Sequence, residues 1–319
     1  MDNIVVSICI ATCNQERYIN ECLESVIGQS EEIRCEILIG DDMSEDGTSA
    51  IAARWAERHR GTVKHFRHTP RLGPAANYQF LVSRARGEFV AHLDGDDMWL
   101  PGKLAAQLDF LRAHPGCPAV YTNAIVVDRD GALRGIFNNR RQPEHFDMAA
   151  MLKRGNFLNH SSLFYRRQAS AAVMDPTPPF IDYLMHLRLA QFGPLGYVNR
   201  PYVVYRVGTS TSMIVRDNAH TRELYWEALS SVTPDDAIHY ALAAGKGDFL
   251  RRIFFRSLRL REPSLFARWA RRILERRSRD RLVIITTMIL SIVTTSLAGF
   301  SEFLGLWLIR GSARVFYRR

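Results

Sequence analysis

The chain has 319 residues and a mean hydropathy of −0.14, and 47% of its residues are hydrophobic and 24% are charged. This composition excludes a disordered, a collagen-like and a polytopic membrane protein. The length is about twice that of a typical domain, so we expect one large domain with appendages or two domains. The five cysteines show neither the spacing of a disulfide framework nor that of a zinc site, which favours a reducing cytoplasm.

The formal net charge of +9 is concentrated towards the C-terminal end of the chain. Residues 251–281 contain twelve Arg and three acidic residues, whereas residues 1–250 carry a net charge of −3. The basic charge is therefore not spread over a folded face, as it is in many nucleic-acid-binding domains. We expect no nucleic-acid partner.

Short apolar runs alternate with amphipathic segments through the first 130 residues. The apolar runs predict strands over 4–11, 35–40, 63–66, 88–93 and 118–127. The amphipathic segments predict helices over 17–28, 47–60, 74–86 and 101–113. This alternation predicts an α/β fold with a mainly parallel sheet and helices on both of its faces. Ligands of such sheets bind beyond the carboxyl ends of the strands.

The pattern becomes mixed after the fifth predicted strand. Residues 128–131 read as a turn that opens a hairpin. A helix over 147–154, a strand over 161–166 and a helix over 183–191 follow, and 217–250 are largely helical. We therefore expect a catalytic domain over 1–215, a helical, Arg-rich connecting segment over 216–281 and a hydrophobic segment over 282–319.

The C-terminal segment begins with 19 residues, 282–300, that carry no charge. About 20 such residues span a bilayer. Polar side chains nevertheless recur at helical spacing, at Thr287, Ser291, Thr294, Thr295, Ser301 and Glu302. A spanning helix, a helix in the membrane plane and a buried or oligomerising helix all remain open.

The Arg-rich segment before this stretch indicates contact with anionic lipids of the cytoplasmic leaflet. The N-terminus shows no secretory signal, because residues 1–3 lead directly into a strand pattern. We expect the protein to associate with the cytoplasmic face of the cell inner membrane through its C-terminal segment.

Acidic residues follow the second and the fourth predicted strands. Asp41 and Asp42 come first, and Asp94, Asp96 and Asp97 form the sequence DGDD with a glycine. Carboxylates that converge at one sheet edge repel one another unless a cation lies between them. Carboxylate oxygens together with substrate phosphates suit Mg²⁺ or Mn²⁺. Solvent-exposed helix caps are the alternative interpretation of these acids.

The first strand is not followed by a glycine-rich phosphate loop. Neither GxGxxG nor GxxxxGK[ST] occurs in the chain, which weighs against dinucleotide and nucleoside-triphosphate binding of those types. A sugar nucleotidyltransferase, which uses a similar sheet and metal, normally has a glycine-rich loop at this place. It remains an alternative function.

Four segments occur in order between residues 4 and 207: VSICIATCNQERYINECLESVIGQ, EILIGDDMSEDGT, RLGPAANYQFLVSRARGEFVAHLDGDDMWLPGKLAAQLDFL and NFLNHSSLFYR. Together they resemble the family 2 glycosyltransferases of the GT-A fold that build bacterial surface polysaccharides. The resemblance implies a metal-dependent, inverting glycosyltransferase that uses a nucleotide-sugar donor and a saccharide acceptor. With the C-terminal segment, it implies a polyprenyl-linked saccharide as acceptor. A membrane-anchored, non-catalytic subunit that binds nucleotide sugar is the other alternative.

The resemblance also implies roles for single residues. It places Thr12, Asn14, Glu16 and Asp41 around the nucleotide. Asp94 and Asp96 match the DxD motif that contacts the ribose and holds Mg²⁺ or Mn²⁺, with Asp97 beside them as a further metal ligand.

Three more positions of the family have counterparts here. Asp182 falls where the family carries its catalytic base, which takes a proton from the acceptor hydroxyl. Ser161, Ser162 and Arg166 match a strand behind the acceptor site. Arg206 lies in YRVG, where Gly208 replaces a frequent His of the family, and we expect Arg206 to assist at the phosphates of the donor.

Overall fold

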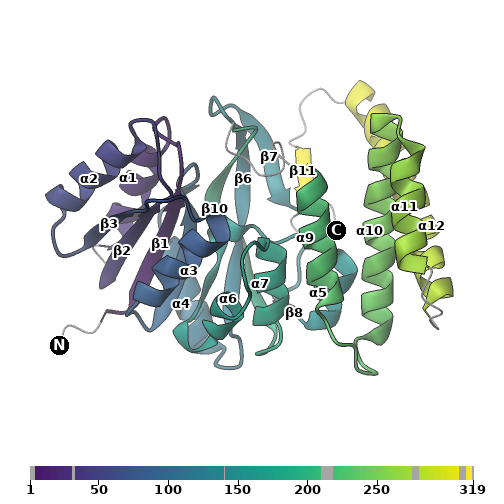
Figure 1. The fold of residues 1–319 in the computed structure, drawn as a ribbon, viewed down its shortest axis with the longest axis horizontal. Coiled ribbons are helices and arrows are strands. Elements are labelled where there is room, and N and C mark those ends of the chain that lie inside the picture. Colours follow the sequence, from purple (N-terminus) through teal and green to yellow (C-terminus); the bar gives the residue numbers. More distant parts are fainter. Residues whose placement is uncertain are drawn as a thin grey trace. The chain divides into compact units, whose positions relative to one another are not determined.

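The computed structural model describes residues 4–30, 33–139, 141–209, 218–274, 280–308 and 314–317. The chain divides into two compact units (Figure 1). One unit comprises Met1–Asp147, Phe157–Leu224 and Arg314–Arg319, and the other comprises Met148–Asn156 and Tyr225–Ala313. The expected boundary between residues 215 and 216 lies outside the described residues. Most of the expected connecting and C-terminal segments falls into the second unit, which also includes the helix near residue 150, whereas 218–224 and 314–317 belong to the first unit.

Four parallel strands form one half of the sheet in the first unit. They are β1 (Val6–Thr12), β2 (Cys35–Asp41), β3 (Val63–Arg67) and β4 (Phe89–Asp94), in the order β3-β2-β1-β4. The side chains of β1, β2 and β4 are buried almost without alternation, as expected for strands covered on both faces, whereas only Val63 is buried in β3. The four predicted strands in this region are confirmed.

The helices between these strands are also where the sequence predicts them. They are α1 (Ile19–Ser30), α2 (Thr48–Arg58), α3 (Pro74–Arg84) and α4 (Lys103–Ala113). Right-handed crossovers place α1 and α2 on one face and α3 on the other, as Figure 1 shows. Helix α3 begins at a proline that follows Gly73, which has φ of 87°, a conformation that favours glycine.

The other half of the sheet is mixed. Its strands are β5 (Met98–Trp99), β6 (Ala119–Asp128), β7 (Leu133–Asn138), β8 (His145–Phe146), β9 (Phe164–Arg166), β10 (Leu195–Val207) and β11 (Arg314–Tyr317). Strand β9 runs antiparallel between β4 and β6, so that β4 and β6 are parallel. The predicted strand over 161–166 is half right, because it begins with a 3-10 turn, η1 (His160–Ser162).

Short helical elements follow β9: η2 (Arg167–Ala169), α6 (Ala171–Met174) and α7 (Asp182–Leu189). Helix α7 agrees with the predicted helix over 183–191. Strand β10 is not predicted, because polar residues and a proline interrupt its pattern at 199–201, where its pairing with β6 shifts register.

The second unit is helical. It contains α5 (Met148–Arg154), α10 (His239–Leu260), α11 (Pro263–Leu274) and α12 (Arg281–Leu308), and α9 (Asn218–Ser230) leads into it. Helix α12 packs closely on α10, because a Cβ atom at Gly247 would lie 2.6 Å from the Ile284 carbonyl oxygen. Within the described parts of the chain, no helix is both long and apolar enough to cross a bilayer.

Candidate active site

The carboxyl ends of β1, β2 and β4 meet at one edge of the sheet. Thr12 lies opposite Asp41 in the register, and Ala11 lies opposite Asp94. The chain then turns at Gly95, whose N–H donates to the Ala11 carbonyl oxygen at 2.9 Å. A Cβ atom at Gly95 would lie 2.8 Å from the Thr12 hydroxyl oxygen, so the turn after β4 needs glycine.

Three carboxylates gather in this turn, and two of them contact one serine. The Ser161 hydroxyl donates to Asp97 at 2.5 Å and approaches Asp94 Oδ2 at 3.3 Å. The Asp94 N–H in turn donates to the Ser161 hydroxyl oxygen at 3.2 Å. Asp96 accepts a hydrogen bond of 3.0 Å from Thr209. The structure thus brings Asp94, Asp96 and Asp97 together with one of the predicted acceptor-side residues, Ser161.

The carboxylates of the turn perturb one another. Burial and the charge of Asp94 raise the pKa of Asp96 to about 6. Burial and the charges of Asp96 and Asp94 raise the pKa of Asp97 well above its ordinary value. Burial also opposes ionisation of Asp94, but the adjacent His92 keeps the pKa of Asp94 below its ordinary value. Repulsion among the carboxylates of this turn therefore opposes the ionisation of Asp96 and Asp97.

The donor set of the turn fits a hard divalent cation. Asp94 keeps 41% of its side chain exposed, and carboxylate oxygens are the preferred ligands of Mg²⁺ and Mn²⁺. Asp97 is different, because it is 1% exposed and its two oxygens accept from Ser161 and from the Arg206 N–H. Asp94 and Asp96 can hold an ion, whereas Asp97 supports the turn.

The acids that follow β2 are held by protein donors. Asp42 accepts from the N–H groups of Leu72 and Gly73 at 2.6 and 2.9 Å. Asp41 is fully buried and accepts from the Ser44 N–H at 2.9 Å. Its other oxygen lies 3.5 Å from His65 Nε2. Burial alone would raise the pKa of Asp41, but these partners lower it to about 2.

The predicted nucleotide-binding residues of the first loop lie beside these acids. Asn14 has φ of 54° and receives the Glu45 N–H on its side-chain oxygen at 2.8 Å. Glu16 receives the Gly47 N–H at 2.9 Å, and Thr12 donates to Gln15 within its own loop at 2.8 Å. Asn14 and Glu16 therefore fasten the loop after β1 to the loop after β2.

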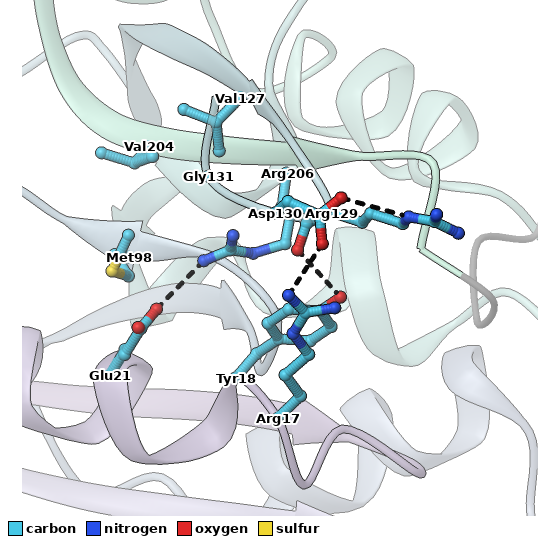
Figure 2. Close-up of a pocket in the computed structure, with 10 residues that line it drawn as sticks. All are labelled: Arg17, Tyr18, Glu21, Met98, Val127, Arg129, Asp130, Gly131, Val204 and Arg206. Carbon is cyan, nitrogen blue, oxygen red and sulfur yellow. Dashed lines mark hydrogen bonds and ion pairs between the residues drawn. The ribbon is translucent and has the colours of Figure 1, made fainter. Parts of the chain in front are cut away.

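Arg206 links the acidic turn to the start of α1. Its guanidinium donates to the Asp96 carbonyl oxygen at 3.0 Å and to Glu21 at 3.1 Å, and it lies 4.5 Å from the Tyr18 ring centroid. Figure 2 shows this guanidinium in the wall of a pocket of about 320 Å³. A buried guanidinium thus contacts the backbone of the acidic turn and is paired with Glu21.

Asp182 occupies the first position of α7. Its carboxylate accepts from the Tyr183 N–H at 2.8 Å and is partly exposed. The ligand atoms of Asp182, His160 and His186 all lie within 4.8 Å of one another, a spacing that could hold a metal ion. His160 Nδ1 lies 3.3 Å from His186 Nε2.

Asp182 is connected to the acidic turn through a row of histidines. The rings of His160 and His92 have centroids 4.0 Å apart, and His92 Nε2 lies 3.1 Å from Asp94. Burial and His92 lower the pKa of His160 well below its ordinary value, while Asp182 and Asp94 both act in the opposite direction. Contacts through His92 and His160 therefore connect the carboxylates of Asp94 and Asp182.

The two remaining acceptor-side residues have structural contacts. The Ser162 hydroxyl donates to the Asn159 carbonyl oxygen at 2.7 Å. Arg166 pairs in register with Phe89, at the opposite end of β4 from Asp94, and its guanidinium holds the Cys117 carbonyl oxygen. We therefore leave Ser162 and Arg166 out of the candidate site.

None of the three histidines, His92, His160 and His186, is among the site residues predicted from the sequence. One signal was present, because Asp182 and His186 are four residues apart and share a face of a helix. His92 and His160 come from other elements, and only the pairing of β4 with β9 brings them together.

Comparisons with known proteins agree with this arrangement. A family model described as Glycosyl transferase family 2 matches residues 7–173, which is more than half of the chain. An uncharacterized protein of Mycobacterium tuberculosis is 33% identical over 202 residues, or 63% of this chain and 58% of that protein. The putative glycosyltransferase EpsE of Bacillus subtilis is 32% identical over 207 residues, or 63% of this chain and 72% of EpsE. The chain thus matches little more than half the length of the mycobacterial relative.

Two solved structures resemble the chain at low sequence identity. S. aureus TarS 1–349 in complex with UDP-GlcNAc has a TM-score of 0.60 at 15% identity, covering 82% of this chain and 89% of that chain. Mannosyltransferase PcManGT from Pyrobaculum calidifontis, in complex with GDP-Man and Mn²⁺, has a TM-score of 0.53 at 17% identity, covering 91% and 87%. These likenesses show a GT-A-like α/β fold. With the family match, they confirm the resemblance found in the sequence.

Proposed function

Because the chain belongs to glycosyl transferase family 2, we propose that it transfers a sugar from a nucleotide-sugar donor to a saccharide acceptor with inversion at the anomeric carbon. One observation carries this proposal. His92 Nε2 lies 3.1 Å from Asp94, and the His92 and His160 rings have centroids 4.0 Å apart. The ligand atoms of His160 and Asp182 lie within 4.8 Å of each other, so a short chain of contacts joins the acidic turn to Asp182. A donor diphosphate at the first group and an acceptor hydroxyl at the second face each other across the transferred sugar.

The donor side is built from the carboxyl edge of the sheet. We assign Asp94 and Asp96 to a divalent cation, Mg²⁺ or Mn²⁺, and Asp97 and Ser161 to holding the turn in shape. The cation, when bound, stabilises the charge that develops on the departing diphosphate. Arg206 adds a fixed positive charge behind the turn and needs no reorganisation during the reaction.

Thr12 and Asp41 lie at the same edge and line the place of the nucleotide. Asn14 and Glu16 act indirectly in this proposal, because their side chains hold the neighbouring loop. They position the wall of the nucleotide site.

The acceptor side is built around Asp182. The Tyr183 N–H fixes one carboxylate oxygen, at the N-terminal end of a helix where a negative charge is stabilised. In an inverting transfer, this carboxylate takes the proton of the acceptor hydroxyl as that oxygen attacks the anomeric carbon. The hydroxyl must then lie about 2.6–3.2 Å from the carboxylate.

The second unit contains an exposed apolar surface on α12. Helix α12 presents Leu282, Leu290 and Leu297 with 77%, 59% and 63% of their surface exposed, together with Ile289 and Val293. These positions fall on one face of a helix, as they do in helices that lie in a membrane interface. We therefore propose docking in the membrane plane with anionic lipids, beside a lipid-linked saccharide acceptor at the cytoplasmic face.

A donor screen tests the proposed reaction. The full chain is incubated with UDP-, GDP- and dTDP-sugars, Mg²⁺ or Mn²⁺, and saccharide acceptors, and released nucleoside diphosphate is measured. We expect one donor class to be consumed, and Asp182→Asn to reduce transfer about 10²- to 10⁴-fold. Asp175→Asn, which alters an exposed carboxylate before the same helix, is the matched control.

The same screen distinguishes the alternatives. A non-catalytic binding subunit would bind a donor and consume none. Transfer by Asp182→Asn at the rate of the wild type would contradict the assignment of the base.

A further inference from the structure

The geometry points to a second cation site, formed by His160, Asp182 and His186, that takes Zn²⁺ in preference to Mg²⁺ or Mn²⁺. Their ligand atoms lie within 4.8 Å of one another. The distance between His160 Nδ1 and His186 Nε2 is 3.3 Å. Two nitrogens that bind one tetrahedral zinc ion, each at about 2.0–2.1 Å, stand about 3.3 Å apart. His160 Nδ1 and His186 Nε2 share a hydrogen bond at this separation, and an ion that displaces its proton finds the two nitrogens at the distance that a shared ion requires.

The three ligands come from two rigid elements. Asp182 and His186 are four residues apart on α7, so both point from one face of the helix, as paired ligands do in helical zinc motifs. His160 comes from η1 and closes the triangle. Few side-chain adjustments are needed to bind an ion here.

Aromatic neighbours fix both imidazole rings. The Tyr121 ring meets His186 edge-on with centroids 5.0 Å apart, and the His92 and Tyr78 rings pack on His160 with centroids at 4.0 and 5.8 Å. His186 is fully buried. Rings that packing holds in one orientation make a preorganised metal site.

The ligand chemistry separates this site from the acidic turn. Two imidazoles and one carboxylate, with one position left for water or substrate, are a donor set typical of Zn²⁺. Asp94 and Asp96 offer only oxygen, which suits Mg²⁺ and Mn²⁺. The acidic turn and the site formed by His160, Asp182 and His186 thus differ in the cation that they prefer.

Occupation of the second site has a consequence that rests on the proposed function. An ion bound to the Asp182 carboxylate withdraws the electron pair that would accept the proton of the acceptor. Zn²⁺ therefore inhibits transfer, and a chelator restores it, whereas donor binding at the acidic turn is unchanged.

Metal binding to the full chain tests the site without any substrate. Zn²⁺ binding is measured by equilibrium dialysis in an excess of Mg²⁺, and the visible absorption of bound Co²⁺ reports the coordination geometry. We expect one tight Zn²⁺ per chain, and at least tenfold weaker binding in His160→Asn and in Asp182→Asn. Asp96→Asn is the matched control and should keep the affinity of the wild type for Zn²⁺. Thermal unfolding of each apoprotein establishes that the variants are folded.

Two results would overturn this site. One is the absence of Zn²⁺ binding by the folded wild-type chain in excess Mg²⁺, and the other is equal affinity in the wild type, His160→Asn and Asp182→Asn. Neither result depends on the donor screen, so failure of the proposed function and failure of the site are distinguishable. In an active preparation, transfer that is unaffected by bound Zn²⁺ would refute the inhibitory role.

Discussion

The loops after β2 and after β4 both begin with aspartates at the same edge of the sheet, yet the pKa values of Asp41 and Asp96 shift in opposite directions. Asp41 and Asp42 receive backbone N–H groups, and the pKa of Asp41 is lowered to about 2. In the loop after β4, burial and mutual repulsion raise the pKa of Asp96 to about 6. Residue type and position are shared, so the difference comes from the available donors.

This contrast separates a loop whose acids are held by backbone N–H groups from a loop whose acids crowd together. Backbone N–H groups hold Asp42 and one oxygen of Asp41, which fixes the shape of their loop. Among the described residues, Asp41 Oδ2 is buried without a hydrogen bond and lies 3.5 Å from His65 Nε2. The acids after β4 crowd together, and a cation relieves that repulsion. Substitutions after β4 should therefore affect activity, whereas substitutions after β2 should affect stability.

Replacing Asp96 should have the largest effect. In Asp96→Asn, one ligand of the cation loses its charge, so we expect donor turnover with Mn²⁺ to fall about 10²- to 10³-fold. Initial rates of nucleoside diphosphate release measure the change. Asp109→Asn, on the exposed side of α4, should retain the wild-type rate. Equal rates in Asp96→Asn and the control would contradict a role of Asp96 in binding the cation.

Replacing Asp42 should reduce stability. Asp42→Ala leaves the N–H groups of Leu72 and Gly73 without their charged acceptor, at a cost of about 2–3 kcal/mol. Urea titration followed by circular dichroism measures the difference in the free energy of unfolding. A change below about 0.5 kcal/mol would mean that solvent serves these donors equally well.

The stabilisation from Asp41 should depend on pH. Its pKa in the folded chain, about 2, lies below the ordinary value of 3.8, so ionised Asp41 favours folding by about 2 kcal/mol above pH 4. This contribution is lost as the pH falls from about 4 towards 2. Unfolding free energies of the wild type and Asp41→Asn, measured at several pH values, should therefore converge in acid. A constant difference between them would contradict the prediction.

Replacing Ser161 should have the smallest effect. Ser161→Ala removes a donor to Asp97, at a cost of about 1–2 kcal/mol, and loosens the turn after β4. We expect Mn²⁺-dependent nucleotide binding to weaken a few-fold, as measured by calorimetry. Ser83→Ala, on an exposed part of α3, is the control, and identical affinities would show that the turn does not need the bridge.

The sequence predicts the parallel half of the fold well and the mixed half less well. Apolar runs mark β1, β2 and β4, a shorter pattern marks β3, and DGDD stands at the end of β4. Strand β10 is hidden, because polar residues interrupt it and its neighbours come from distant parts of the chain. Local patterns cannot show such pairings.

The candidate site divides in the same way. The acids after β2 and β4 and Asp182 are visible in the sequence through position and resemblance. The contacts of His92 with His160, and of Asn14 with the neighbouring loop, depend on tertiary packing. Arg166 is the opposite case. It occupies a motif position of the family, but in the structure it lies beside Phe89, at the end of β4 opposite Asp94.

The central claim is a division of labour between the turn after β4 and Asp182. Calorimetric binding of nucleoside diphosphate with Mn²⁺, measured for the wild type, Asp96→Asn and Asp182→Asn, tests it most directly. We predict that Asp96→Asn loses Mn²⁺-dependent binding and that Asp182→Asn keeps the wild-type affinity while it fails to transfer sugar. Wild-type affinity in Asp96→Asn, or loss of nucleotide binding in a folded Asp182→Asn, would contradict it.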